Sequence, residues 1–493
     1  MEFDKDLRSI QEVRDLVARA KAAQAEYAAY SQEQVDAIVR SVAEACAAQA
    51  ERLAKMASEE TGFGVWQDKV LKNKLGSTMT YESIKDLKTV GVLREDEEKG
   101  IMEVAVPVGV IAALIPSTNP TSTVMYKSLI SLKSGNAIII SPHPNAKNCI
   151  LETYQVVAQA AKAAGAPDGI VQCVSIPTAE GTSALLKHRD IGLILATGGE
   201  PMVRAAYSSG NPALGVGPGN GPSFIEKSAN IPLAIKRIFD SKTFDNGTIC
   251  ASEQSIVTER CIQDQVIAEA KRQGGYFLSP EESEKVGRFI MRANGSMNPK
   301  IVGRSAAVIA DMAGIRVPEG TRVLISPQTT VGKDNPYSRE KLCPILAFYV
   351  EEDWEGACKR SIEILFNEGV GHTMTIHSQD KSVIREFAPK KPVSRLLVNT
   401  PGALGGVGAT TGLPPALTLG CGAVGGSATS DNVGPMNLIN IRRVAYGLRE
   451  LEDLRGTPGT CRGAEKKEAC ASNLSREEIE AITRAVLARL NAV

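Results

Sequence analysis

One of the ten cysteines in the chain lies in a segment that could make its thiol reactive. Cys250 belongs to TFDNGTICAS at residues 243–252, where Asn-Gly and small polar residues predict a tight turn. Such a turn can present a thiol at the end of a strand or the start of a helix, where backbone N–H groups lower the thiol pKa. A buried, unreactive cysteine is the alternative that these residues leave open.

Two adjacent glycines form a second candidate site. Gly198 and Gly199, in ATGGE at residues 196–200, lie where a predicted strand meets a predicted helix. Backbone N–H groups and the helix dipole at such a junction can bind a pyrophosphate, although a tight turn without a ligand fits equally. We expect no metal site, because none of the histidines has metal-ligand spacing with a cysteine or a carboxylate. The four histidines are His143, His188, His372 and His377.

The elements that could position these residues alternate along the chain. Residues 104–209 alternate β-rich runs with amphipathic segments, and residues 223–398 contain a second series of strand candidates. Short apolar strands separated by helices predict βαβ units and parallel sheets. The first hundred residues are helical by their periodicity. Nine glycines in residues 402–426 predict an irregular stretch in which backbone approaches backbone or ligand closely.

Composition restricts the partners of the chain. Its 493 residues include 56 basic and 56 acidic side chains, so there is no general attraction to nucleic acid or to an anionic membrane, and neither is expected. The longest apolar run, residues 104–115, is shorter than the roughly 18 to 20 residues of a membrane-spanning helix. The charged N-terminus lacks the apolar core of a secretory signal, which predicts a cytoplasmic protein with reduced thiols.

The last forty residues differ in character from the rest. A polar segment at residues 452–473 predicts a linker, and the capping box SREE at 475–478 predicts an amphipathic helix over 474–493. A short helix on a linker needs a partner surface. That surface could belong to the same protein or oligomer, or to another protein.

Five separated motifs resemble one enzyme family. They are TFDNGTICAS at 243–252, PSTNPTST at 116–123, TLGCG at 418–422, SDNVGP at 430–435 and NLINI at 437–441. Over about residues 5–448 the chain resembles the CoA-acylating aldehyde dehydrogenases, the acetaldehyde and propionaldehyde enzymes of the aldehyde dehydrogenase superfamily. The resemblance implies an α/β aldehyde dehydrogenase fold with a Rossmann-like cofactor domain, an α/β catalytic domain and an oligomerisation strand arm.

The resemblance also implies domain boundaries. A chain of this length is expected to lack the iron alcohol dehydrogenase domain of the fused bifunctional enzymes. The implied segments are a Rossmann-like domain at 1–222 with arm strands at about 88–106, a catalytic domain at 223–428, an oligomerisation strand at 429–451, the linker at 452–473 and the helix at 474–493. This C-terminal helix resembles peptides that send enzymes into bacterial microcompartments.

Catalytic roles follow from the resemblance residue by residue. Cys250 resembles the nucleophile that attacks the aldehyde carbon and carries the acyl group as a thioester. Asn119 resembles the asparagine that forms the oxyanion hole with the backbone N–H of the nucleophile; a turn-forming Asn-Pro is the alternative. His372 resembles a histidine that assists CoA or acyl transfer, although a core histidine fits nearly as well. Cys421 is expected to pack and not to react.

One departure from the hydrolytic members predicts the fate of the thioester. Those enzymes carry a Glu-Leu-Gly-Gly-Lys segment whose glutamate activates water, whereas this chain has VGPGN at 216–220. Val216 takes the place of the glutamate and cannot accept a proton, so hydrolysis should be slow. A thiol needs less help than water, which favours transfer to coenzyme A.

The resemblance implies NAD as cofactor and coenzyme A as co-substrate. NADP is not excluded, because SPHP at 141–144 stands where hydrolytic members place a lysine and a glutamate beside the adenosine ribose. Glu340 matches the glutamate that binds the nicotinamide ribose. The residues expected to contact the cofactor are Thr118, Ser141, Pro142, Gly198, Gly199, Gly217 and Glu340.

The resulting hypothesis is an NAD-dependent acetaldehyde dehydrogenase (acetylating) that acts reversibly on a short aldehyde. Propionaldehyde and sulfoacetaldehyde are alternative substrates, and a hydrolytic dehydrogenase and a non-catalytic microcompartment scaffold are alternative functions. The expected partners are the aldehyde, coenzyme A, further copies of the chain in a homodimer or homotetramer, and a microcompartment shell protein bound through the C-terminal helix. A cytoplasmic location inside a microcompartment follows from the same resemblance.

Overall fold

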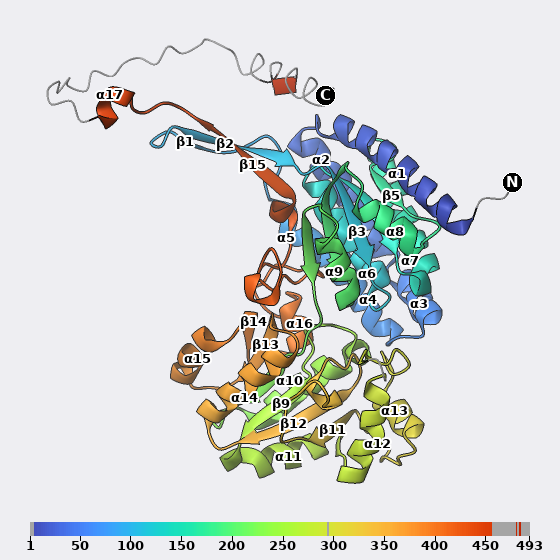
Figure 1. Ribbon diagram of the computed structural model, residues 1–493, viewed down its shortest axis with the longest axis vertical. Helices are drawn as coiled ribbons and strands as arrows, with labels where there is room; N and C mark the ends of the chain where they lie inside the picture. The colour runs from blue at the N-terminus through green and yellow to red at the C-terminus, as the bar shows by residue number, and fades with distance from the viewer. Residues whose placement is uncertain (1–3, 293–294, 456–479, 481–482, 485–493) are drawn as a thin grey trace.

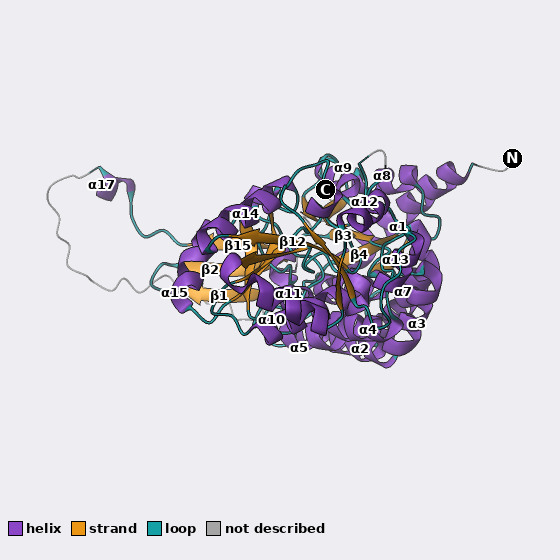
Figure 2. Cartoon of the chain, turned by 90° about the horizontal axis from the view of Figure 1, so that it is seen from below, coloured by secondary structure: helices purple, strands orange, loops and turns teal. Residues whose placement is uncertain are grey.

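The computed structural model describes residues 4–292, 295–455, 480 and 483–484 of the chain. The described strands form three sheets, of five, seven and three strands. In Figure 1 the five-stranded sheet lies in the upper half of the molecule, the seven-stranded sheet lies in the lower half, and the three-stranded sheet projects to the upper left as an arm. Figure 2 shows helices around the strands of the two large sheets. The predicted α/β fold with parallel sheets is confirmed.

The five-stranded sheet is parallel throughout. Every residue of its two strands β3 (Val110–Ile115) and β4 (Ala137–Pro142) is buried. Continuous apolar runs of this kind are typical of parallel strands that helices cover on both faces. The strand order is β5 (Val171–Cys173), β4, β3, β6 (Ile191–Thr197) and β7 (Ala213–Val216).

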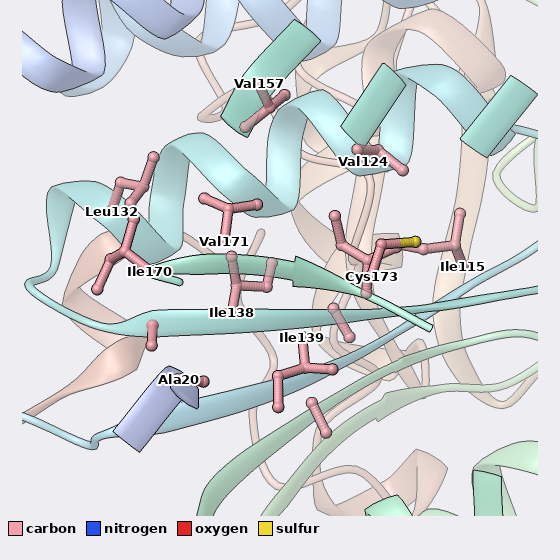
Figure 3. Close-up of a cluster of buried hydrophobic side chains, with 14 of the residues drawn as sticks. Ala20, Ile115, Val124, Leu132, Ile138, Ile139, Val157, Ile170, Val171 and Cys173 are labelled. Atoms are coloured by element: carbon pink, nitrogen blue, oxygen red, sulfur yellow. The ribbon is translucent and has the colours of Figure 1, made fainter. Parts of the chain in front are cut away.

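Helices from the first 210 residues lie around this sheet, some against its strands and others packed on those helices. They are α1 (Lys5–Tyr27), α2 (Gln32–Ala48), α3 (Ala50–Thr61), α4 (Trp66–Lys74), the π-helical η1 (Leu75–Met79), α5 (Thr80–Ile84), α6 (Pro120–Lys133), η2 (Pro144–Ala146), α7 (Lys147–Ala163), α8 (Ala179–Leu186) and α9 (Glu200–Tyr207). Figure 3 shows Val124 of α6 and Val157 of α7 on one side of β4 and Ala20 of α1 on the other. The apolar core of this half therefore has helices on both faces of the sheet.

The seven-stranded sheet is also parallel. Its order is β10 (Gly275–Phe277), β11 (Val323–Pro327), β12 (Ile345–Glu351), β9 (Ser255–Glu259), β8 (Pro222–Ile225), β13 (Gly371–His377) and β14 (Val393–Val398). The helices of this half are α10 (Ile231–Thr243), η3 (Phe244–Gly247), η4 (Arg260–Ile262), α11 (Gln263–Arg272), α12 (Pro280–Ile290), α13 (Ala306–Met312), η5 (Pro336–Ser338), α14 (Trp354–Asn367), α15 (Lys381–Phe387) and η6 (Ala388–Lys390).

The arm joins segments from both ends of the described chain. Strand β2 (Ile101–Pro107) pairs antiparallel with β1 (Val92–Asp96) on one side and with β15 (Ile439–Ala445) on the other. Strand β15 is an edge strand, and most of its residues are exposed. The short elements that lead to and from it are α16 (Gly402–Gly406), η7 (Ala423–Gly425), η8 (Pro435–Leu438) and α17 (Leu451–Leu454).

The glycine-rich stretch at residues 402–426 is more regular than predicted. Gly402–Gly406 forms the one-turn helix α16, so the expectation of a wholly irregular segment is wrong. The predicted close approach of backbones is confirmed, because a Cβ atom on Gly420 would lie 2.3 Å from the carbonyl oxygen of Thr429. Glycine has no Cβ atom, which lets the backbones approach this closely at Gly420.

Two predictions concern the ends of the chain. The predicted linker beyond Arg455 and almost all of the predicted helix at 474–493 lie outside the described residues. Within the described part of the chain, no helix has the length and apolar character needed to cross a bilayer.

Candidate active site

Cys250 follows a turn with unusual backbone geometry. Asp245 and Asn246 have φ values of 50° and 51°, and Gly247 has a φ of 79°. Asp, Asn and Gly are the residues that tolerate this left-handed region best, so the local sequence explains the predicted turn. The turn ends η3 and places Cys250 between η3 and β9 with its side chain partly exposed.

An apolar cluster surrounds the cysteine. Cys250 packs against a cluster that includes Val216 at the end of β7 and the neighbouring residues Ile249 and Ala251. The cluster also contains Cys421, which is buried as expected for a packing residue. Val216 therefore contributes an apolar side chain, and no carboxylate, to the cluster against which Cys250 packs.

The expectation that the turn lowers the thiol pKa is wrong for the protein alone. Burial raises the pKa of Cys250 to about 12, and Glu340 and Cys421 raise it further, while Arg395 acts in the opposite direction. A backbone hydrogen bond lowers the pKa but does not compensate for the burial. The thiol is therefore protonated near neutral pH, and its attack on a carbonyl requires loss of a proton.

Asn119 is held in a defined orientation at the start of α6. Its Oδ1 accepts a hydrogen bond of 2.6 Å from Lys72 Nζ, and its Nδ2 donates one of 3.2 Å to Thr118 Oγ1. An ammonium group only donates, so the amide oxygen must face Lys72. The amide nitrogen therefore faces away from Lys72. One of its two hydrogens is bonded to Thr118 Oγ1, and the second can be donated to a substrate oxygen.

His372 and Glu340 approach Cys250 from two sides of Gly219. A Cβ atom on Gly219 would lie 1.8 Å from the carbonyl oxygen of Cys250 and 3.4 Å from Cε1 of His372. The backbone nitrogen of Gly219 donates a 3.0 Å hydrogen bond to Glu340 Oε1. Three of the residues singled out from the sequence therefore meet around one glycine.

The ionisation of these two side chains is set by burial. His372 is buried, and burial together with Arg395 lowers its pKa to about 3, so the ring is neutral. Its Nδ1 lies 3.0 Å from Thr373 Oγ1, and among the described residues Nε2 has no hydrogen-bond partner. Burial raises the pKa of Glu340 to about 8. Near neutral pH both side chains are thus mostly uncharged.

The other residues expected to contact a cofactor lie at one edge of the five-stranded sheet. Ser141 and Pro142 are the last residues of β4, and Thr118 lies between β3 and α6. Gly198 and Gly199 connect β6 to α9, and the described part of the chain supplies no side-chain cap to the N-terminus of α9. Gly217 directly follows β7. The carboxyl edge of a parallel sheet with an uncapped helix start is where dinucleotides bind in such folds.

Comparison with known proteins identifies the family. The profile of the aldehyde dehydrogenase family matches residues 7–307. The chain belongs to the aldehyde dehydrogenase family. In sequence it is 47% identical over 442 residues to the bifunctional aldehyde-alcohol dehydrogenase of Escherichia coli K12, covering 89% of this chain and 50% of that protein. It therefore spans about half the length of that relative.

A relative of similar length is the succinate-semialdehyde dehydrogenase (acetylating) of Clostridium kluyveri, 39% identical over 438 residues and covering 89% of this chain and 96% of the relative. A probable aldehyde dehydrogenase from Listeria monocytogenes is 64% identical, with a TM-score of 0.91 and coverage of 92% and 100%. An acetylating aldehyde dehydrogenase from Geobacillus thermoglucosidasius is 51% identical, with a TM-score of 0.90 and coverage of 91% and 99%. The propionaldehyde dehydrogenase from the fucose utilisation microcompartment of Clostridium phytofermentans is 28% identical, with a TM-score of 0.81 and coverage of 88% and 97%.

Sequence reasoning missed a group of charged residues that contact the candidate active site of this family member. Lys69 and Lys72 lie one helical turn apart on α4 and both pair with Asp245 in the turn before Cys250. Arg395, on β14, is buried and donates hydrogen bonds to the backbone of His372 and Gly420. The i, i+3 spacing of the two lysines was the available signal, but it is equally typical of an exposed helix face.

No group of three or more His, Cys, Asp or Glu side chains suited to a metal ion occurs among the residues that the structure describes. The catalytic and cofactor-binding roles of the residues named above stay predictions.

Proposed function

We propose that this chain oxidises a short aldehyde to an acyl-CoA through a thioester on Cys250, with NAD as the electron acceptor. The observation that carries the proposal is Val216, which lies in the apolar cluster around Cys250 where a water-activating carboxylate would be needed for hydrolysis. The acetylating relatives by sequence and structure support the same activity.

The chain's own groups suit the first half of this reaction. The Cys250 sulfur attacks the aldehyde carbon, and the oxygen that gains the negative charge accepts hydrogen bonds from Asn119 Nδ2 and the backbone N–H of Cys250. The thiol proton is lost to solvent as the sulfur attacks. NAD, when bound at the carboxyl edge of the five-stranded sheet, supplies the two-electron acceptor that converts the adduct into a thioester.

The second half is transfer of the acyl group from Cys250 to the sulfur of coenzyme A. The carbon–sulfur bond to Cys250 breaks as the bond to the CoA sulfur forms, and the proton of the CoA thiol passes to the Cys250 sulfur, which returns to its thiol form. The neutral ring of His372, with its unpartnered Nε2, can accept a hydrogen bond from that thiol. A pKa of about 3 makes His372 suited to orienting the thiol more than to holding its proton.

Arg395 is not available to bind a carboxylate or sulfonate of a substrate. Its five N–H donors are used by five protein oxygen atoms. With all five used, no donor of this guanidinium remains for an anionic substrate group. We therefore infer acetaldehyde as the substrate, with propionaldehyde as the next candidate and sulfoacetaldehyde as the less suited one. The acceptors are Thr373 Oγ1, Asn432 Oδ1 and the carbonyl oxygens of His372, Gly420 and Ser430.

The deciding experiment measures NADH formation by absorbance with acetaldehyde, with and without coenzyme A. Strong dependence on coenzyme A with acetyl-CoA as the product is expected. Steady turnover to acetate without coenzyme A would mean that another group activates water, and no turnover in either case would favour a non-catalytic scaffold. Repeating the assay with NADP in place of NAD tests the cofactor preference.

The arm supports association of this chain with further copies of itself. Strand β15 is an exposed edge strand, and Ile441, Tyr446 and Leu448 beside it are exposed apolar side chains. An unpaired strand edge with apolar neighbours demands a partner. A homodimer or homotetramer formed through the arm is the proposal, and light scattering on the purified protein tests it by the absolute mass.

The similarity to a microcompartment enzyme of Clostridium phytofermentans supports a place for this chain inside such a compartment. The polar segment and amphipathic helix predicted at the C-terminus would provide the contact with a shell protein. Removing residues 455–493 should leave turnover intact and abolish co-purification with shells. Equal recovery of the truncated and full-length proteins with shells would contradict this role.

A further inference from the structure

Three charged side chains form a buried cluster between α4 and the turn before Cys250. The side chains of Lys69 and Lys72 are 3% exposed, and that of Asp245 is fully buried. Asp245 Oδ2 accepts hydrogen bonds from both lysines, and Asp245 Oδ1 accepts one of 2.7 Å from the backbone nitrogen of Val65. Burying ions in this way costs free energy, so such a cluster is retained for its geometry more readily than for stability.

Lys72 contacts one side chain of the predicted oxyanion hole and the turn that leads to the other donor. Its Nζ donates to Asn119 Oδ1 at 2.6 Å, which fixes the side chain that supplies one donor. The same Nζ lies 3.0 Å from Thr248 Oγ1 and 3.3 Å from the Thr248 carbonyl oxygen, two residues before the backbone N–H that supplies the other donor. One ammonium group therefore joins the start of α6 to the turn that presents Cys250.

The contact also decides which way the Asn119 amide points. The two ends of an amide have nearly the same shape, and only hydrogen bonds distinguish them. With Oδ1 held by Lys72, Nδ2 faces the side on which a substrate oxygen would lie. Without the ammonium group, Oδ1 could turn towards that oxygen and repel the negative charge that develops there.

We propose that Lys72 is a positioning residue that orients the Asn119 amide and holds it in register with the backbone N–H of Cys250. This inference rests on the proposed function, in which these two groups stabilise the oxyanion. Lys69 has a different task, because its Nζ donates to Asp245 Oδ2 at 2.9 Å and to the Thr118 carbonyl oxygen at 3.3 Å, and among the described residues it makes no hydrogen bond with Asn119 or Thr248.

A double-mutant cycle on the full-length chain tests the proposal. The variants are Lys72→Met, Asn119→Ala and the combination, with CoA-dependent NADH formation as the assay. We expect Asn119→Ala to lower kcat by about 10² to 10³-fold, as for removal of one oxyanion donor. Lys72→Met should lower kcat by roughly 10 to 100-fold in the wild-type background and by less than about threefold in the Asn119→Ala background, because the two residues act as one unit.

Matched controls separate orientation from folding. Lys69→Met removes an equally buried lysine that pairs with the same carboxylate. Its fold-loss in kcat should be the same in the wild-type and Asn119→Ala backgrounds. Lys72→Gln keeps a hydrogen-bond donor and should recover part of the kcat, and it replaces Lys72→Met in the cycle if the latter does not fold. The rate of Cys250 alkylation by iodoacetamide should stay within about threefold in folded Lys72 variants, since the thiol itself is not changed.

The outcomes distinguish the two proposals. If the double variant loses kcat by the product of the two single-variant losses, the positioning role of Lys72 is wrong. The proposed function would remain in place. Absence of CoA-dependent activity in the unmodified chain, or full activity in Cys250→Ala, would overturn the proposed function before the cycle is reached.

Discussion

The backbone nitrogen of Gly219 is 3.0 Å from Glu340 Oε1, and the same glycine separates the backbone of Cys250 from the ring of His372. A methyl group at residue 219 would lie 1.8 Å from the Cys250 carbonyl oxygen, which is closer than any non-bonded contact allows. Three groups of the candidate active site are thus held at their spacing by the absence of one side chain.

Gly219→Ala should therefore lower kcat/KM by about 10²-fold, because a displacement of about 1 Å at a reacting group has an effect of this size. The measurement is CoA-dependent NADH formation, with thermal unfolding to show that the fold persists. Gly412→Ala is the matched control, since Gly412 is exposed and a Cβ there meets no atom of the described residues within 4 Å. Equal activity of both variants would contradict the packing described around Gly219.

Val216→Glu should create a hydrolytic activity. The new carboxylate would lie in the apolar cluster around Cys250, where burial raises its pKa towards the range of a general base. We expect acetate formation without coenzyme A to rise at least about tenfold, up to the roughly 10²-fold that a general base contributes. Val216→Gln has nearly the same size without the base and should not gain this activity. Equal acetate formation by the two variants would argue against a role for the missing carboxylate.

The Cys250 thiol should react slowly at neutral pH in the absence of cofactor. With a pKa raised to about 12, the thiolate fraction rises tenfold for each pH unit between 7 and 10, and so should the rate of alkylation by iodoacetamide. The test is mass spectrometry of the Cys250 peptide over that pH range. Cys261, which is exposed, serves as the internal control for alkylation of an accessible thiol. A plateau for Cys250 near pH 8 would show that another group ionises it.

Arg395→Met should weaken both the fold and the nucleophile. Five oxygen atoms would lose their donor in a buried place, which predicts a fall in unfolding free energy of about 2 to 5 kcal/mol. Loss of the positive charge also removes the one side-chain effect that lowers the pKa of Cys250, so alkylation at a fixed pH should slow. Urea unfolding and alkylation measure the two effects. Arg385→Met, an exposed arginine on α15, should change neither.

The sequence predicts those features whose causes lie close together along the chain. The apolar runs of β3 and β4 are continuous, so their burial in a parallel sheet can be read directly. The turn before Cys250 depends on its own Asp-Asn-Gly residues. Features that depend on distant partners cannot be found in this way. Lys72 lies 47 residues from Asn119 and 176 from Thr248, and only the folded chain brings the three together.

The same distinction explains the two wrong expectations. A turn next to a cysteine suggests a lowered thiol pKa, but the apolar cluster that raises it is assembled from segments as far apart as Leu75 and Leu438. The glycine-rich stretch suggests an irregular chain, but packing of α16 against α10 and β13 permits a helical turn. In both cases the tertiary surroundings override the local preference.

The pairing of β2 with β15 can form only late in the synthesis of the chain. Pro107 and Ile439 are partners in the arm, and 439 minus 107 gives a separation of 332 residues. At about 5 to 20 residues per second, a ribosome needs roughly 20 to 60 seconds between the two. Both large sheets can be complete before the third strand of the arm emerges. Nascent chains that still lack β15 therefore cannot offer a finished arm to one another, which favours folding of each chain before assembly on crowded polysomes.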